Sequence, residues 1–299
     1  MYHYVRDLKL SKYKKLKVLK IENFKKQIKY LKKNYIFFNP NDKIKNYINK
    51  KVCWLTFDDG YIDHYNYVLP ILEENKIKAS FFISSNIESK KILEVNKVQF
   101  ILERKKSSEL LKEIKILYNS ILKLKSNNKI NQIIKKIKFD HRYDSKETIT
   151  IKRLLQRDLH KKVRKKIIGL LFKKYVEGNE AKFHKELYMN IKHLKILKNL
   201  GHEIGNHTQN HEWLSKLNRV DQILEIKRNL IFLQKHKLIN EKWTMCYPFG
   251  DYNTTTLEVL KKFNCSRALT TSVGSATKKN HILKLPRLNA NDFYPIRKN

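Results

Sequence analysis

Apolar residues in this chain follow two alternating patterns. Five short runs combine apolar, β-branched and aromatic residues, as buried strands do: 35–38, 52–57, 79–84, 243–247 and 268–271. Other stretches repeat apolar residues at the spacing of amphipathic helices: 24–33, 65–75, 188–199, 220–236 and 254–263. Strands that alternate with helices of this length predict an α/β fold in which helices cover a parallel sheet.

One stretch departs from this alternation. From about residue 88 to 178 the sequence consists largely of Lys, Leu, Ile and Glu at helical spacing, without a comparable strand-like run. We interpret residues 88–184 as a helical insertion in a core domain that comprises residues 1–87 and 185–299. A separate helical linker domain is the alternative interpretation.

Two adjacent carboxylates follow the second predicted strand, in the motif Thr56-Phe57-Asp58-Asp59-Gly60. Asp-Gly after a strand is also a common turn. Like charges side by side repel, so Asp58 and Asp59 require a cation or a shared proton unless they point apart.

A pair of histidines, His207 and His211, is separated by four positions. In a helix this spacing places both imidazoles on one face, as two ligands of one metal require, although two ordinary histidines would show the same spacing. Residues 201–206 predict a turn and a short strand, so His207 is expected at the carboxyl edge of the sheet.

A third motif, Tyr247-Pro248-Phe249-Gly250, ends another predicted strand and by itself indicates a turn. In an α/β barrel the carboxyl ends of the strands converge on one mouth. We therefore expect the aspartate pair, the histidine pair and this turn to lie together.

With these three motifs the sequence resembles the polysaccharide deacetylase family (NodB-like, carbohydrate esterase family 4). Residues 56–60 match its T-F-D-D-G motif, 207–211 its H-[ST]-x-x-H motif and 247–250 part of its R-x-P-[FY]-G motif. Residues 1–5 look like the first strand of some members. The resemblance implies a distorted (β/α) barrel that hydrolyses an acetyl group from an N-acetylated, or sometimes O-acetylated, sugar.

The resemblance also implies roles for individual residues. Asp59, His207 and His211 would bind a divalent metal, usually Zn²⁺, and Asp58 would be the general base. Such a metal activates water and polarises a carbonyl group. Tyr247 and Phe249 would contribute to substrate binding and to the oxyanion site, the latter through its backbone N–H.

The sequence differs from the family pattern at two sites. Cys246 stands where the family has the arginine that steadies the base, and a small apolar strand residue is the simplest interpretation of it. Arg287 replaces the late histidine that supplies a general acid. Arg287 could orient a carboxylate or bind substrate, but it cannot donate a proton near neutral pH. The acid would then be His3 or His281, or no dedicated residue.

The charge of the chain introduces an alternative function. Lys and Arg number 65 against 28 Asp and Glu, a formal net charge of +37. Of these cations 54 are Lys and 11 are Arg, a ratio typical of a solvated surface rather than of bidentate phosphate recognition. Because such a charge attracts anionic polymers, the alternative is a catalytically weak module that binds nucleic acid or anionic glycan through its lysine-rich surface.

Cysteine content and hydropathy bear on the compartment. With 3 Cys the chain has no disulfide framework. No stretch reaches the roughly 18 apolar residues of a membrane span, and residues 1–10 lack the apolar centre of a signal peptide. We expect a cytoplasmic protein that acts on an acetylated carbohydrate, or an extracytoplasmic one if the true start lies upstream.

Overall fold

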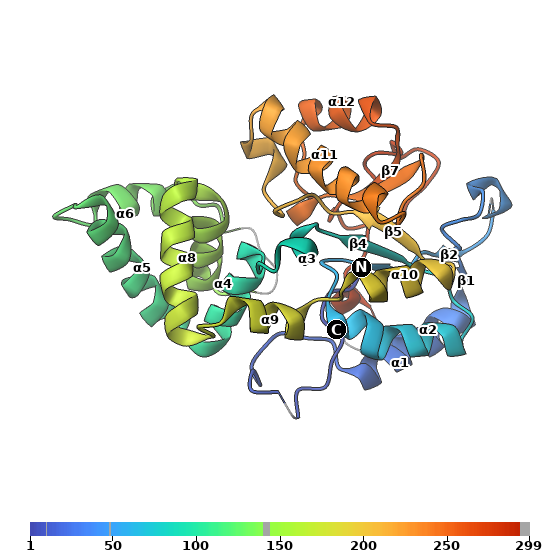
Figure 1. The fold of residues 1–299 in the computed structure, drawn as a ribbon, viewed down its shortest axis with the longest axis horizontal. Coiled ribbons are helices and arrows are strands. Elements are labelled where there is room, and N and C mark those ends of the chain that lie inside the picture. The colour runs from blue at the N-terminus through green and yellow to red at the C-terminus, as the bar shows by residue number, and fades with distance from the viewer. Residues whose placement is uncertain (10, 48, 140–143, 294–299) are drawn as a thin grey trace. The chain divides into compact units, whose positions relative to one another are not determined.

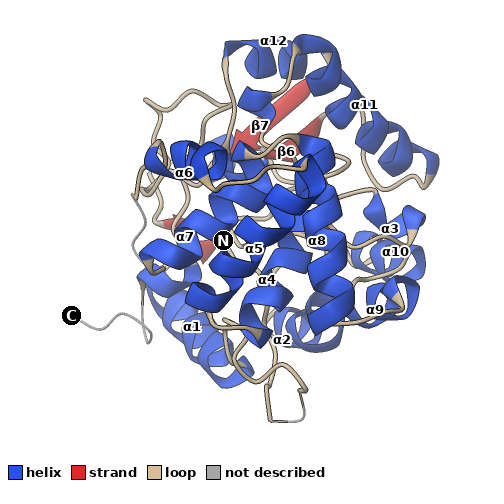
Figure 2. Ribbon diagram, turned by 90° about the vertical axis from the view of Figure 1, so that its left-hand side faces the viewer, coloured by secondary structure: helices blue, strands red, loops and turns tan. Residues whose placement is uncertain are grey.

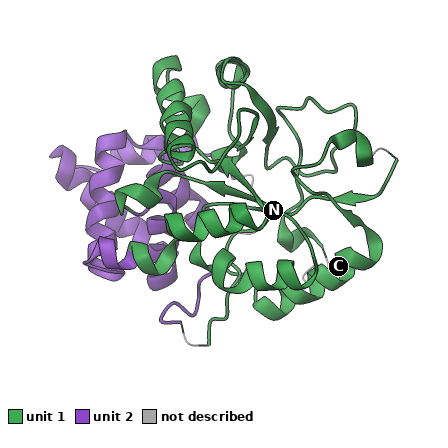
Figure 3. Cartoon of the chain, turned by 45° about the vertical axis from the view of Figure 1, so that its right-hand side comes forward, with its two compact units in different colours: residues 1–10, 17–91, 184–299 green, residues 11–16, 92–183 purple. Residues whose placement is uncertain are grey.

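The computed structural model describes residues 1–9, 11–47, 49–139 and 144–293. The chain divides into two compact units (Figure 3). The sheet unit comprises Met1–Leu10, Lys17–Lys91 and His184–Asn299, and the helical unit comprises Ser11–Leu16 and Ile92–Phe183. Whether these units match independent domains with boundaries at 88 and 184 stays a prediction.

The sheet unit contains a curled half-barrel of five parallel strands in the order β3-β4-β5-β6-β7 (Figure 1). Their bounds are Thr56–Phe57, Ser80–Ile83, Glu203–Asn206, Trp243–Cys246 and Cys265–Leu269. Neighbouring strands pair in parallel throughout. All five carboxyl ends therefore point to the same edge, and the predicted barrel-like α/β fold is confirmed.

Helices lie along the outer face of this curled sheet (Figure 1). Towards β6 and β7 lie α11 (Arg219–Lys235) and α12 (Thr254–Lys262). Towards β3 and β4 lie α2 (Leu69–Glu74) and α10 (Ile191–Asn199), with α1 (Ile21–Asn34) beside them. A π-helical turn, His64–Val68, precedes α2, and the short α3 (Asn86–Ser89) follows β4.

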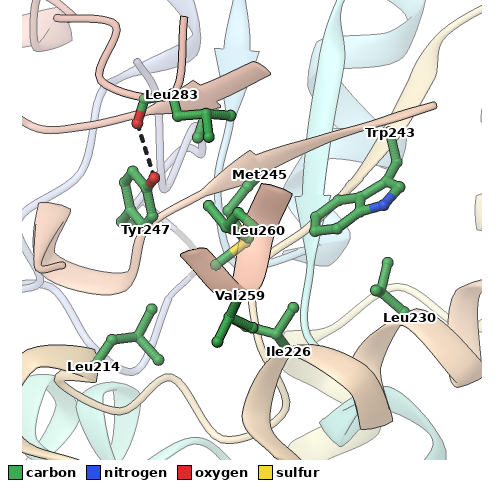
Figure 4. Packing of buried hydrophobic residues seen from close by; sticks show 10 residues of the cluster. Leu214, Ile226, Leu230, Trp243, Met245, Tyr247, Val259, Leu260 and Leu283 are labelled. Atoms are coloured by element: carbon green, nitrogen blue, oxygen red, sulfur yellow. Dashed lines mark hydrogen bonds between the residues drawn. The ribbon is translucent and has the colours of Figure 1, made fainter. Parts of the chain in front are cut away.

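Apolar packing holds α11 and α12 against β6. Trp243 and Met245 of β6 are buried among Ile226 of α11 and Val259 and Leu260 of α12 (Figure 4). Each such side chain contributes about 1.5–3 kcal/mol by burial. This cluster fixes the strand that carries the third motif.

Two predicted strands differ from the structure. The run 52–57 is divided, because β2 (Val52–Cys53) pairs with β1 (Ile36–Phe37) in a separate two-stranded sheet, whereas β3 pairs with β4. Residues 1–5 form no continuous strand. Tyr2 bridges to Phe57 of β3, but Val5 bridges to Leu19, so the segment pairs with two different neighbours.

The helical unit contains α4 to α8, with the bounds Glu94–Arg104, Ser107–Leu122, Asn128–Lys135, Lys146–Arg153 and Lys161–Tyr175. Helices α4, α5, α7 and α8 lie side by side (Figure 2). In α8 pairs of buried residues such as Ile167 and Ile168 alternate with exposed pairs such as Lys165 and Lys166. The chain re-enters the sheet unit within α9 (Glu180–Leu187). The helical character predicted for the insertion is confirmed.

Within the described ranges, none of the helices combines the length and hydropathy needed to cross a membrane.

Candidate active site

The two adjacent aspartates lie in a sharp turn directly after β3. Asp59 (φ 73°) and Gly60 (φ 70°) both have left-handed backbone conformations. Glycine suits the second position because it adopts positive φ without strain, and because a Cβ there would lie 3.0 Å from the Ile83 side chain. The turn directs the carboxylates of Asp58 and Asp59 to different partners, which avoids their mutual repulsion.

Arg287 binds the carboxylate of Asp58 in bidentate fashion. Its Nη1 and Nη2 donate to Oδ1 and Oδ2 of Asp58 at 3.0 and 2.9 Å. The remaining guanidinium contacts are to the Thr270 carbonyl (2.8 Å), the Thr56 hydroxyl (3.2 Å) and Cys246 Sγ (3.0 Å). Arg287 therefore lies against Cys246, the position at which the family motif has its arginine.

Burial and charge oppose each other at Asp58. Burial by itself raises the pKa of this carboxyl, but Arg287, followed by His207 and His3, lowers it well below its usual range. Burial likewise lowers the pKa of Arg287, and the charge of Asp58 more than reverses this effect. Both groups are therefore ionised at neutral pH.

Asp59 faces both histidines. Its Oδ1 lies 3.3 Å from Nε2 of His207 and 3.5 Å from Nε2 of His211. The other oxygen, Oδ2, accepts a hydrogen bond of 2.6 Å from the Tyr61 hydroxyl. Oδ1 is buried and has no hydrogen-bond partner in the part of the chain that the structure describes. One carboxylate oxygen and two imidazole nitrogens thus converge in a pattern that can hold a metal ion.

The two histidines lie in a loop, and not in the helix in which their spacing would place both imidazoles on one face. β5 ends directly before His207, as expected, but Thr208 (φ 61°) and His211 (φ 56°) have left-handed conformations that no helix accommodates. Glu225 of α11 stabilises the loop by accepting bonds from the Asn210 backbone and side chain at 2.8 and 2.6 Å. The loop brings the two imidazole centroids to 4.8 Å.

The pKa values of the two histidines are shifted in opposite directions. Burial opposes a charged His207, but Cys246, Asp59 and Asp58 raise its pKa well above the usual value. Its Nδ1 lies 2.8 Å from the Cys246 carbonyl, which orients the ring. Burial lowers the pKa of His211 to about 4, so His211 is neutral at pH 7. The acidic surroundings therefore outweigh burial at His207, whereas burial dominates at His211.

The third motif contributes Phe249 to the site. This residue lies in the 3₁₀ turn Pro248–Gly250 with a left-handed backbone (φ 57°). Its ring contacts the edge of His211 at 4.6 Å and stacks on Trp213 at 4.6 Å. The turn thus meets the histidine loop, as the convergence of strand ends predicts.

Tyr247, in contrast, directs its side chain away from the carboxylates. It is buried in the core beside Met245, and its hydroxyl donates to the Leu283 carbonyl at 2.8 Å (Figure 4). A contribution of Tyr247 to substrate binding is thereby restricted to its backbone.

The two candidate acids lie in different surroundings. Nε2 of His3 is 4.0 Å from Asp58 Oδ2, and its side chain is 40% exposed. The backbone carbonyl of His3 lies 2.8 Å from Nε2 of the buried His64. His281 is exposed, and its Nδ1 accepts a bond from the Leu283 amide at 3.1 Å. Of the two, His3 is the one that the structure brings to the carboxylates.

Two residues near the site were not singled out by the sequence analysis. Tyr61 binds Asp59, and Trp213 stacks on Phe249. Both are aromatic residues within two positions of a motif, Tyr61 directly after Gly60 and Trp213 two residues after His211. Their proximity to the motifs is the feature of the sequence by which they could have been identified.

Comparisons with known proteins agree with this arrangement. A family model described as Polysaccharide deacetylase matches residues 45–115 and 163–268. No curated protein sequence matches the chain significantly.

Several solved structures share the fold. The Streptococcus pyogenes deacetylase PplD, solved with acetate, is 20% identical with a TM-score of 0.58, covering 96% of this chain and 89% of its own. A Bacillus cereus polysaccharide deacetylase is 18% identical with a TM-score of 0.52, covering 96% of this chain and 62% of its own. A de-N-acetylase from Aggregatibacter actinomycetemcomitans is 13% identical with a TM-score of 0.52, covering 99% of this chain and 95% of its own.

None of these similarities supports the alternative of a basic binding module. The family model spans more than half of the sequence, including the aspartate turn, the histidine loop and the Pro-Phe-Gly turn. The resemblance seen in the motifs is thereby confirmed, and the chain belongs to the polysaccharide deacetylase family, a family of carbohydrate-deacetylating hydrolases.

Proposed function

We propose that this protein is a metal-dependent deacetylase that hydrolyses the acetamide of an N-acetylated sugar or polysaccharide. One observation carries the metal dependence. Among the described residues Asp59 Oδ1 has no hydrogen-bond partner; it is buried and faces Nε2 of both His207 and His211. A buried carboxylate oxygen without a partner is costly unless a cation or a proton compensates it.

The donor set fits a divalent cation, and Zn²⁺ best. Ligand atoms about 2.0–2.1 Å from a tetrahedral zinc lie about 3.3 Å from one another. The separations of 3.3 and 3.5 Å between Asp59 Oδ1 and the imidazole nitrogens agree with this value. Asp59, His207 and His211 would hold the ion, which supplies the positive charge that acidifies water and polarises the acetamide carbonyl.

Asp58 is the proposed general base. The bidentate contact with Arg287 keeps its carboxylate ionised and directed, so it can accept a proton from the attacking water. In this chain Arg287 performs the steadying function that the family assigns to an arginine at the position of Cys246. Arg287 is therefore a positioning residue for the base and cannot serve as the acid.

Phe249 and His3 complete the proposed reaction. The backbone N–H of Phe249 would donate to the carbonyl oxygen as negative charge develops on it. His3, partly exposed and 4.0 Å from Asp58, would donate a proton to the sugar nitrogen as the carbon–nitrogen bond breaks. The products are acetate and a free amine on the sugar.

The test is acetate release from a panel of N-acetylated and O-acetylated glycans, with Zn²⁺ added or chelated. Asp58→Asn removes the proposed base. Asp63→Asn is the matched control, because Asp63 is a buried aspartate paired with an arginine, Arg6, at 2.7 Å. We expect release by the wild-type protein and by Asp63→Asn, loss on chelation, and a fall of at least 100-fold in Asp58→Asn.

Release that continues at full rate under chelation would contradict the metal dependence. Equal activity of Asp58→Asn and wild type would contradict the assignment of the base. If acetate is released only from O-acetylated glycans, the substrate is an acetate ester and not an acetamide.

A further inference from the structure

Tyr61 lies beside the proposed metal ligands without being one of them. Its hydroxyl donates to Asp59 Oδ2 at 2.6 Å, and its side chain is fully buried. The same carboxylate presents its other oxygen, Oδ1, to the two imidazoles. The tyrosine thus binds one of the two Asp59 oxygens and leaves the other to the proposed cation.

This division of the two oxygens determines the orientation of Asp59. The terminal torsion of an aspartate has a broad, roughly two-fold preference, so packing alone orients a carboxylate weakly. A short hydrogen bond from a fixed donor selects one orientation. Partners that bind metal ligands in this way orient them, and their loss typically weakens metal affinity 10–100-fold.

Tyr61 is a fixed donor because its ring and backbone are both held. The ring stacks on Tyr4 with centroids 4.0 Å apart and lies parallel to Tyr188 at 6.1 Å. The backbone forms an antiparallel bridge with Tyr188, and the adjacent Gly60 carbonyl accepts from the Met189 amide at 3.0 Å. The position of the hydroxyl therefore follows from contacts that do not involve the oxygen itself.

We propose that Tyr61 is the positioning residue that orients Asp59 for metal binding, a proposal that rests on the metal site of the proposed function. Tyr61 does not touch the reacting atoms in this assignment. It acts through Asp59, by keeping Oδ1 directed at Nε2 of His207 and His211.

The test compares Tyr61→Phe with Tyr2→Phe, each of which deletes one buried hydroxyl and keeps the ring. Tyr2 is a matched control, because it also lies in the sheet unit and stacks on Phe57 at 5.1 Å, and its hydroxyl has no hydrogen-bond partner among the described residues. Zn²⁺ affinity is measured by competition with a chromophoric chelator. Thermal unfolding of the metal-free proteins, read in parallel, separates loss of fold from loss of affinity.

We expect Tyr61→Phe to bind Zn²⁺ 10–100-fold more weakly than wild type, and Tyr2→Phe to retain wild-type affinity. Unchanged affinity in Tyr61→Phe would overturn the proposal, as would an equal loss in both variants. Asp59→Ala removes the proposed carboxylate ligand, so it separates failure of the metal site from failure of the Tyr61 proposal. If wild type and Asp59→Ala bind Zn²⁺ equally, the proposed metal site fails, and the role of Tyr61 fails with it.

Discussion

The ion pair between Arg287 and Asp58 is the feature whose removal has the largest expected effect. The two side chains are only 5% and 3% exposed, and two parallel hydrogen bonds connect them. The perturbation is Arg287→Gln, which removes the cation and leaves a carboxylate buried without its counter-charge. Asp58→Asn leaves the opposite charge, a buried guanidinium, without its partner.

The magnitude follows from burial. Breaking a buried ion pair by removing one partner costs about 3–5 kcal/mol, because the remaining charge is desolvated and uncompensated. The double variant Arg287→Gln, Asp58→Asn contains neither charge, so its cost is expected to be smaller than the sum of the single costs. The double-mutant cycle should therefore give a coupling energy of about 3 kcal/mol.

The sign of the pH dependence is also defined. In the wild type the pKa of Asp58 lies below its unfolded value of about 3.9, so the pair stabilises the fold above that pH and loses this contribution as pH falls below it. In Arg287→Gln burial dominates and raises the pKa of Asp58. The stability of the variant relative to wild type should then be lowest near pH 7 and should recover towards pH 4.

The assay is urea unfolding of the metal-free protein followed by tryptophan fluorescence. The 3 Trp residues, Trp54, Trp213 and Trp243, all belong to the sheet unit, so the signal reports on the unit that contains the ion pair. A coupling energy below about 1 kcal/mol would refute the reasoning, because solvent-exposed ion pairs have coupling energies in that range. A loss of stability in Arg287→Gln that is equal at pH 4 and pH 7 would refute it as well.

Two further predictions concern groups away from this pair. Burial lowers the pKa of His202 to about 4, against about 6.5 when unfolded. Because the unfolded chain binds the proton more readily, about 3 kcal/mol of stability should be lost as pH falls from 6.5 to 4. The urea midpoint of unfolding, measured against pH, should therefore fall over this range in wild type and change less in His202→Asn. Gly250 has φ 70°, and a Cβ there would lie 2.7 Å from the Thr271 backbone nitrogen. Gly250→Ala should therefore displace the adjacent Phe249 and lower the rate of acetate release at least tenfold with zinc affinity kept; an unchanged rate would contradict the proposed oxyanion role.

Much of the fold could be predicted from short-range patterns. The strand ends at Phe57 and Ile83 follow from apolar runs that stop at polar residues, and a parallel sheet places such ends at one edge. The division of 52–57 between two sheets could not be predicted in this way. Both halves are apolar, and which neighbour each half pairs with depends on residues far along the chain.

The geometry of the histidine pair shows the same limit. The spacing of His207 and His211 correctly marked two groups that come together, but it suggested a helix. The loop that the structure contains depends on Glu225 in α11, whose contact with Asn210 spans 15 positions. Periodicity within the motif contains no information about that contact.

The sequence by itself determined the family, the parallel α/β fold, the helical nature of the insertion and the motifs that meet at one edge of the sheet. These properties are encoded locally, in apolar periodicity and in short motifs whose backbone conformation their own residues dictate. The partner of Asp58 was settled by tertiary contacts alone. Arg287 is 229 positions away, and its guanidinium lies against Cys246, where the sequence indicated a lost arginine. A buried carboxylate requires a counter-charge in space, and the chain supplies it from whichever segment the fold brings there.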